Sequence, residues 1–125
     1  MMFEEPGVER PPARLVVAGE HPIHAWWRVL EGLTPGDMPQ AARHLLGALI
    51  AECVTNADGK ILGAVSVRQL AHSTGMSLVE VRNLTASLER RDWLVRLEER
   101  VGDPAVATAY HVRLDGRRWR RGDRQ

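Results

Sequence analysis

The sequence predicts a mainly α-helical domain with a small β-hairpin, an α+β fold, and three observations lead to this prediction. Apolar residues recur every three to four positions in several segments between residues 22 and 91, which is the period of an amphipathic helix. Beyond residue 91 the period changes to two, which is typical of half-buried strands. Segments rich in Gly, Pro, Asp and Asn separate these stretches and indicate turns.

Two segments precede the main domain. Residues 1–20 contain three prolines, and we expect them to form a flexible N-terminal arm. Residues 21–36 combine a helix at about 22–33 with a linker rich in helix breakers. The apolar positions of this helix are Ile23, Trp26, Trp27 and Leu30.

The main domain is expected to begin with a helix at about 38–54. Asp37 is a good N-cap residue, and Gln40 stands three residues later, where the partner of a capping box belongs. A continuous apolar stripe then follows one face of the helix. Its members are Ala42, Leu45, Leu46, Leu49, Ile50 and Cys53.

Two short helices in succession are predicted between residues 66 and 91. Ser66 is expected to cap the first helix and Ser77 the second, with Glu80 completing a capping box. Gly75 stands where the first helix must end in a left-handed conformation. Val81, Leu84 and Leu88 recur at helical spacing, so we expect them to form the buried side of the second helix.

Two strands, 93–101 and 107–114, are predicted next, joined by a turn at 102–106. In the first strand Val95, Leu97 and Val101 share one face, and Arg96, Glu98 and Arg100 share the other, which we expect to be open. In the second strand Tyr110, Val112 and Leu114 share a face, and His111 and Arg113 share the opposite one. Residues 116–125 are rich in Arg and are expected to be a disordered tail.

This order of elements resembles the winged helix–turn–helix superfamily. The stretch SVRQLAHSTGMSLVEVRNLTASLERRDWLVRL, residues 66–97, carries the resemblance, which looks most like MarR-type regulators and the related domains of phage and plasmid replication proteins. It implies a domain over residues 37–115 that is mainly α with a small β-wing, preceded by an extra N-terminal helix. The sequence departs from the family pattern at Leu78 and Val79, where polar or basic residues are frequent, and at Asp92, where Gly is common.

The resemblance implies that helix 77–91 reads the major groove of double-stranded DNA and that wing 94–113 contacts the DNA backbone. Arg82 suits guanine and Asn83 suits adenine, because both side chains form paired hydrogen bonds with base edges. Leu78 and Val79 favour a protein contact for this helix or contact with thymine methyl groups. The expected DNA-binding residues are Ser66, Arg68, Ser77, Leu78, Val79, Arg82, Asn83, Ser87, Arg96, Arg100 and Arg113.

A homodimer is expected through the N-terminal helix. Adjacent residues on a helix point about 100° apart, so Trp26 and Trp27 cannot both lie on one narrow stripe. One is expected to pack on the domain and the other against a partner subunit; the alternative is that both cap the monomer's own core. The predicted interface residues are Ile23, Trp26, Trp27 and Leu30.

Charge is distributed unevenly along a chain whose net charge is only +1. Residues 1–60 hold five Lys/Arg and eight Asp/Glu, whereas residues 61–125 hold twelve Lys/Arg and eight Asp/Glu. Sixteen of the seventeen basic residues are Arg, which suits phosphate and guanine contacts but also follows from codon bias in a GC-rich genome. The Arg run around Trp119 either binds phosphates or serves only solubility.

We expect a cytoplasmic, nucleoid-associated bacterial protein that has no cofactor or metal and is not an enzyme. No apolar run approaches the roughly 20 residues that span a bilayer, and the N-terminus lacks the pattern of a secretory signal. The histidines are dispersed, and Cys53 belongs to a core stripe. A transcription regulator is the expected function. The alternatives are a DNA-binding component of a plasmid or phage replication or partition system, and a winged-helix protein-interaction module.

Overall fold

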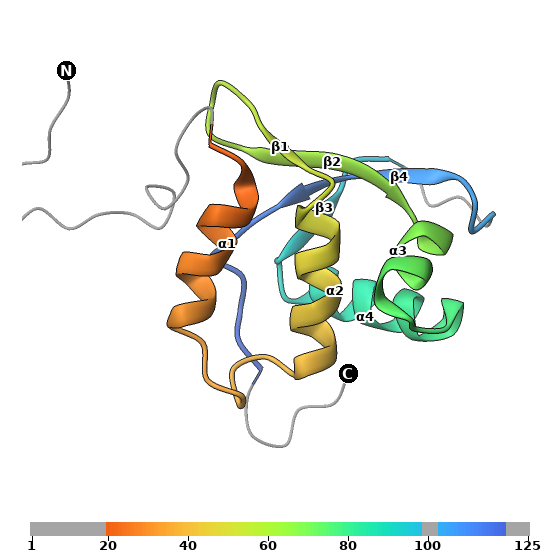
Figure 1. Cartoon of the computed structure of the whole chain (residues 1–125), viewed down its shortest axis with the longest axis horizontal. Coiled ribbons are helices and arrows are strands. Elements are labelled where there is room, and N and C mark those ends of the chain that lie inside the picture. The colour runs from red at the N-terminus through yellow and green to blue at the C-terminus, as the bar shows by residue number, and fades with distance from the viewer. Residues whose placement is uncertain (1–19, 99–102, 120–125) are drawn as a thin grey trace, which may run out of the picture.

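The computed structural model describes residues 20–98 and 103–119, which form an α+β fold (Figure 1). The elements in chain order are α1 (Pro22–Glu31), α2 (Gln40–Ile50), β1 (Val54–Thr55), β2 (Ile61–Ser66), α3 (Val67–Thr74), α4 (Leu78–Arg90), β3 (Leu94–Arg96) and β4 (Ala107–Val112). The longest of these helices has 13 residues, so no helix in the described part of the chain is long and apolar enough to cross a membrane.

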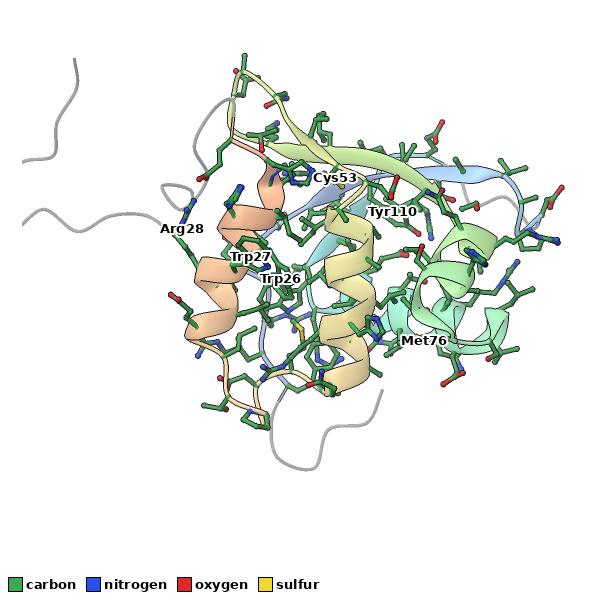
Figure 2. All side chains as sticks on the ribbon, viewed as in Figure 1. Trp26, Trp27, Arg28, Cys53, Met76 and Tyr110 are labelled. Atoms are coloured by element: carbon green, nitrogen blue, oxygen red, sulfur yellow. The ribbon has the colours of Figure 1, made fainter. Side chains whose placement is uncertain are left out.

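The four strands form one antiparallel sheet in the order β1-β2-β4-β3. The helices lie on one side of this sheet, with α2 between α1 and the α3–α4 pair (Figure 1). The core fills the space between the two layers. Tyr110 of β4 is labelled in Figure 2 and lies between the sheet and the helices, where its side chain is buried.

The buried stripe of α2 is confirmed, but its predicted ends are not. Ala42, Leu45, Leu46, Leu49 and Ile50 are buried, and the helix stops at Ile50. Cys53, which we expected on the helix, lies beyond its end, and its buried thiol donates to the carbonyl of Leu49 at 3.3 Å.

The predicted N-cap of α2 is wrong. The helix begins at Gln40, and its N-cap residue is Pro39, which makes no side-chain capping bond. The Asp37 carboxylate instead accepts a hydrogen bond from the Thr34 backbone N–H at 2.8 Å. This bond closes the preceding turn, and it lowers the pKa of Asp37.

The strands β3 and β4 differ in how well their buried faces are predicted. In β4 the prediction is confirmed, because Tyr110 and Val112 are buried. In β3 it is wrong, because Leu94 is buried whereas Val95 is exposed. Leu94 pairs with Val112 and Val95 with His111, and directly paired residues project from the same face of a sheet. The side chains of β3 therefore follow those of β4.

The segments on either side of the main domain contribute to its core. Trp26 of α1 is 2% exposed and meets Trp93 edge to face, with ring centroids 6.3 Å apart. Trp119 is also buried in this core, so residues 116–119 do not belong to a disordered tail as predicted. The backbone N–H of Trp119 donates to the Asp37 carbonyl at 2.7 Å, and Arg91 stacks over its ring.

Candidate nucleic-acid interface

The turn between α3 and α4 fixes the direction of the second helix. Gly75 adopts φ 76° and ψ 13°, a left-handed conformation that a side chain disfavours, and its N–H donates to the Ala71 carbonyl. Met76 is half-buried and packs against the core (Figure 2). The predicted ending of α3 at Gly75 is therefore confirmed.

A capping box holds the start of α4 as predicted. The Ser77 hydroxyl accepts a hydrogen bond from the Glu80 N–H at 3.1 Å, and the Glu80 carboxylate accepts one from the Ser77 N–H at 3.0 Å. Each of the two residues thus satisfies a backbone donor of the other. The Glu80 carboxylate is exposed but already engaged at the helix terminus.

The two sides of α4 differ sharply in exposure. Its inner side is buried, and the prediction of Val81, Leu84 and Leu88 as core residues is confirmed. On the outer side Val79 is 66% exposed, and Asn83 is also exposed. The remaining positions of this side are Leu78, which is 37% exposed, Arg82 and Ala86, which are half-buried, and Arg90, which is exposed.

Ser87 does not lie on the outer side of α4 as predicted. It is 0% exposed, and its hydroxyl accepts a hydrogen bond from the Arg91 guanidinium at 3.1 Å. Arg91 is in turn held over Trp119, at 4.1 Å from the ring centroid. The C-terminal segment therefore covers the C-terminal part of α4 on the side that carries Ser87.

Of the two predicted contacts at the start of α3, one is exposed and the other is buried. Ser66 is buried, and its hydroxyl caps α3 by accepting from the Gln69 N–H at 2.9 Å. Arg68 is exposed, and its backbone N–H donates to the Pro104 carbonyl at 2.9 Å. This bond fastens the segment before β4 to the first turn of α3. Gln69 and His72 are exposed on the same helix and are not among the predicted contacts.

The basic residues of the hairpin are less available than the sequence suggests. Arg96 is half-buried and pairs with Glu89 of α4 at 3.1 Å, so its prediction as an open-face residue is wrong. Arg113 is exposed and pairs with Asp115 at 3.4 Å. Arg100 lies outside the described residues. Of these three only Arg113 is therefore seen at an exposed position.

The predicted dimer residues on α1 divide as the helical geometry requires. Trp26 points toward α2 and is buried, so its assignment to an interface is wrong. Trp27 is 54% exposed and meets His24 edge to face, with ring centroids 5.1 Å apart (Figure 2). Ile23 and Leu30 are half-buried beside the core. An exposed indole on a helix away from α4 is the feature that remains available to a partner.

Titratable groups form no metal cluster among the residues that the structure describes. The two histidines of the sequence HPIH have separate structural roles: His21 caps α1 by accepting from the Ile23 N–H at 3.1 Å, and His24 packs on Trp27. Burial raises the pKa of the Cys53 thiol to about 12, which disfavours the reactive thiolate at neutral pH.

Of the predicted contacts, the structure exposes Leu78, Val79 and Asn83 on α4 and Arg68 on α3, and these two helices pack against each other. Gln69 and His72 of α3 are also exposed and were not predicted as contacts, although a helical projection of residues 67–74 places His72 nearly opposite Leu70, the buried residue of α3. Comparison of the chain with known protein families, with curated proteins and with solved structures gives no match. Membership of the winged helix–turn–helix superfamily therefore stays a prediction.

Proposed function

We propose that the chain is a winged helix–turn–helix protein that binds double-stranded DNA, most simply as a transcription regulator. One observation carries the proposal: α4, the second helix of a pair joined by a tight turn, is fastened to the core on one side and open on the other. Val79 on the open side is 66% exposed, whereas Val81 and Leu88 opposite are 0% exposed. A helix fixed in this way fits the major groove, which is about 12 Å wide.

The surroundings of α4 support this orientation. The β3–β4 hairpin follows the helix directly and pairs with β2, which is the arrangement that the resemblance implies for a wing. The exposed cationic side chains on α3 and α4 are Arg68 and Arg90. Glu80, the exposed acid on α4, is engaged in the capping box. Arg68 and Arg90 therefore offer positive charge to phosphate on both helices.

Salt dependence of binding tests the proposal. The full chain is titrated against a fluorescent duplex of random sequence at several salt concentrations between about 50 and 200 mM. We expect measurable binding at low salt that weakens steeply as salt rises, because each phosphate contact releases bound counterions. Failure to bind any duplex at low salt would overturn the proposal.

Two arginine variants locate the contact. Arg68→Ala removes an exposed cation at the start of α3, and we expect weaker binding to all duplexes and a salt slope that is lower by about one. Arg28→Ala is the matched control, because Arg28 lies on α1, on the far side of α2, where it pairs with Glu20 at 2.7 Å. Equal losses in the two variants would contradict the assignment of the surface to α3 and α4.

Arg82→Ala and Asn83→Ala separate base contacts from phosphate contacts. If these side chains touch base edges, each variant lowers discrimination between duplexes by about 5- to 150-fold, the range of a paired hydrogen bond to one base. Equal weakening on specific and random duplexes would assign them to phosphates instead. Both residues lie on the outer side of α4, so circular dichroism is expected to show an unchanged fold.

A specific observation also favours a second candidate, a protein-interaction module. Leu78 is 37% exposed and Val79 is 66% exposed, and apolar side chains at the start of α4 suit a protein surface. This alternative predicts no duplex binding at low salt. It further predicts that a partner captured by the chain is lost on Val79→Asp and retained on Arg68→Ala.

We also propose a homodimer formed through α1. The exposed Trp27 ring, supported by His24, offers the large rigid contact that interfaces use, and it leaves α4 free. Light scattering of the full chain tests this proposal. We expect twice the monomer mass and its loss on Trp27→Ala. A monomeric wild-type chain at micromolar concentration would overturn it.

A further inference from the structure

The open side of α4 carries one polar side chain between two apolar ones. Val79, Asn83 and Ala86 follow one another at spacings of four and three residues, so they lie on one face of the helix. Val79 is 66% exposed, Asn83 is exposed and Ala86 is half-buried. The next position on this face is Arg90, so the stripe has no carboxylate. We call these four residues the α4 stripe.

The chemistry of the α4 stripe matches one kind of base pair. An Asn side chain forms two hydrogen bonds with the major-groove edge of adenine, and the thymine methyl is the apolar group that the major groove presents. Val79 and Ala86 present methyl groups on either side of Asn83. With a rise of about 1.5 Å per residue, they lie about 10 Å apart along the helix, or about three base-pair steps.

We infer that the α4 stripe selects duplex DNA in which an adenine read by Asn83 is flanked by thymine methyl groups read by Val79 and Ala86. This inference rests on the proposed DNA binding and names the class of site that is bound. Val79 is 66% exposed in the free chain. Contact with a thymine methyl would bury this apolar surface, and burial of apolar surface is favourable.

Deoxyuridine tests the inference, because it keeps every hydrogen-bonding group of thymidine and lacks only the methyl. The full chain first selects duplexes from a pool with a randomised central segment. The best duplex is then synthesised again with each thymidine replaced singly by deoxyuridine. We expect enrichment of A·T pairs and a loss of affinity of about fourfold for each methyl contacted, the value of one buried methyl group.

A matched pair of valines assigns the methyl contact to α4. Val79→Ala is expected to abolish the deoxyuridine penalty at one thymine and to leave the others unchanged. Val54→Ala is the control, because Val54 is also 66% exposed but lies on β1, at the edge of the sheet away from β3. Asn83→Ala is expected to remove the adenine preference at the neighbouring pair, by about tenfold.

The outcomes separate the inference from the proposed function. Absence of binding to any duplex at low salt overturns DNA binding and, with it, the inference. Binding that keeps its full affinity after every thymidine is replaced by deoxyuridine overturns the inference alone. A deoxyuridine penalty that persists unchanged in Val79→Ala also overturns it, because another part of the chain then reads the methyl groups.

Discussion

The helix pair α3–α4 and the β3–β4 hairpin are neighbours that the sequence specifies in different ways. Each helix of the pair is capped by a serine whose partner lies three residues further on, and Gly75 sets the turn between them. The buried face of β3 is instead set by its pairing with β4, ten or more residues away. Capping is a local property, whereas strand facing depends on register, and a shift of one residue inverts every side chain.

The test with the largest expected effect truncates two neighbouring residues of β3, one buried and one exposed. Leu94→Ala is expected to lower the free energy of unfolding by about 2–5 kcal/mol, because Leu94 is 2% exposed and its truncation leaves a cavity. Val95→Ala is the control, and we expect it to cost less than about 1 kcal/mol, because Val95 is 36% exposed. Urea denaturation measures both. A larger loss for Val95→Ala than for Leu94→Ala would show that Val95 faces the core, as the alternation in the sequence predicts. It would contradict the contrast between the hairpin and the helix pair.

The turn of the helix pair offers a test of intermediate size. Gly75→Ala is expected to cost about 1–2 kcal/mol, because φ 76° places a side chain in the left-handed region. Nothing lies within 4 Å of the added methyl, so the loss reports backbone strain alone. Gly36→Ala is the control on an exposed turn without a positive φ. Thermal unfolding that does not separate the two variants would contradict the local origin of this turn.

The capping box gives a smaller effect. Ser77→Ala is expected to lower the free energy of unfolding by about 1 kcal/mol, because the Glu80 N–H loses its acceptor. Ser73→Ala is the matched control, since Ser73 is an exposed serine within α3 and no cap. We expect that variant to be neutral or slightly stabilising, because Ala favours helix. Equal losses measured by urea denaturation would show that Ser77 does not act as a cap.

The same contrast between local and distant contacts explains which predictions were confirmed. The caps at Ser66 and Ser77 and the ending at Gly75 need only neighbouring residues, and the structure has all three. Asp37 has a suitable spacing for a cap, but the Thr34 N–H competes for its carboxylate. Nothing in the local pattern shows whether the Asp37 carboxylate accepts from the Thr34 N–H or from the first turn of α2.

The contrast between local and distant contacts also explains why only part of the candidate surface was predicted. The outer positions Val79 and Asn83 follow from the helical period and the buried stripe opposite them. Ser87 was misplaced because its hydroxyl accepts from Arg91, which is held over Trp119, a residue 32 positions away from Ser87 in the sequence. Arg96 was misplaced by the inverted facing of β3. Contacts across such distances leave no periodic signal.

The smallest expected effect is a pH dependence that belongs to the hairpin. His111 lies on the outer face of β4, opposite Val95 and Leu62. Burial lowers its pKa below the ordinary 6.5, the positive charges of Lys60 and Arg113 lower it further, and Asp115 opposes them. Between the folded and unfolded pKa values the unfolded chain binds more protons, so the free energy of unfolding falls as the pH is lowered from 6.5. Below the folded pKa this loss is complete.

His111→Gln is expected to remove this part of the pH dependence, so that the variant and the wild-type chain differ in their loss of stability below about pH 6.5 but not above it. Urea denaturation at pH values between about 5 and 7.5 measures the difference. His72→Gln is the control on the helix pair, because His72 is exposed on α3. If the two variants change the slope equally, the sensitivity does not arise from pairing in the sheet. If only His111→Gln does, the pH sensitivity belongs to His111 in the sheet, where burial and the charges of Lys60 and Arg113 lower its pKa.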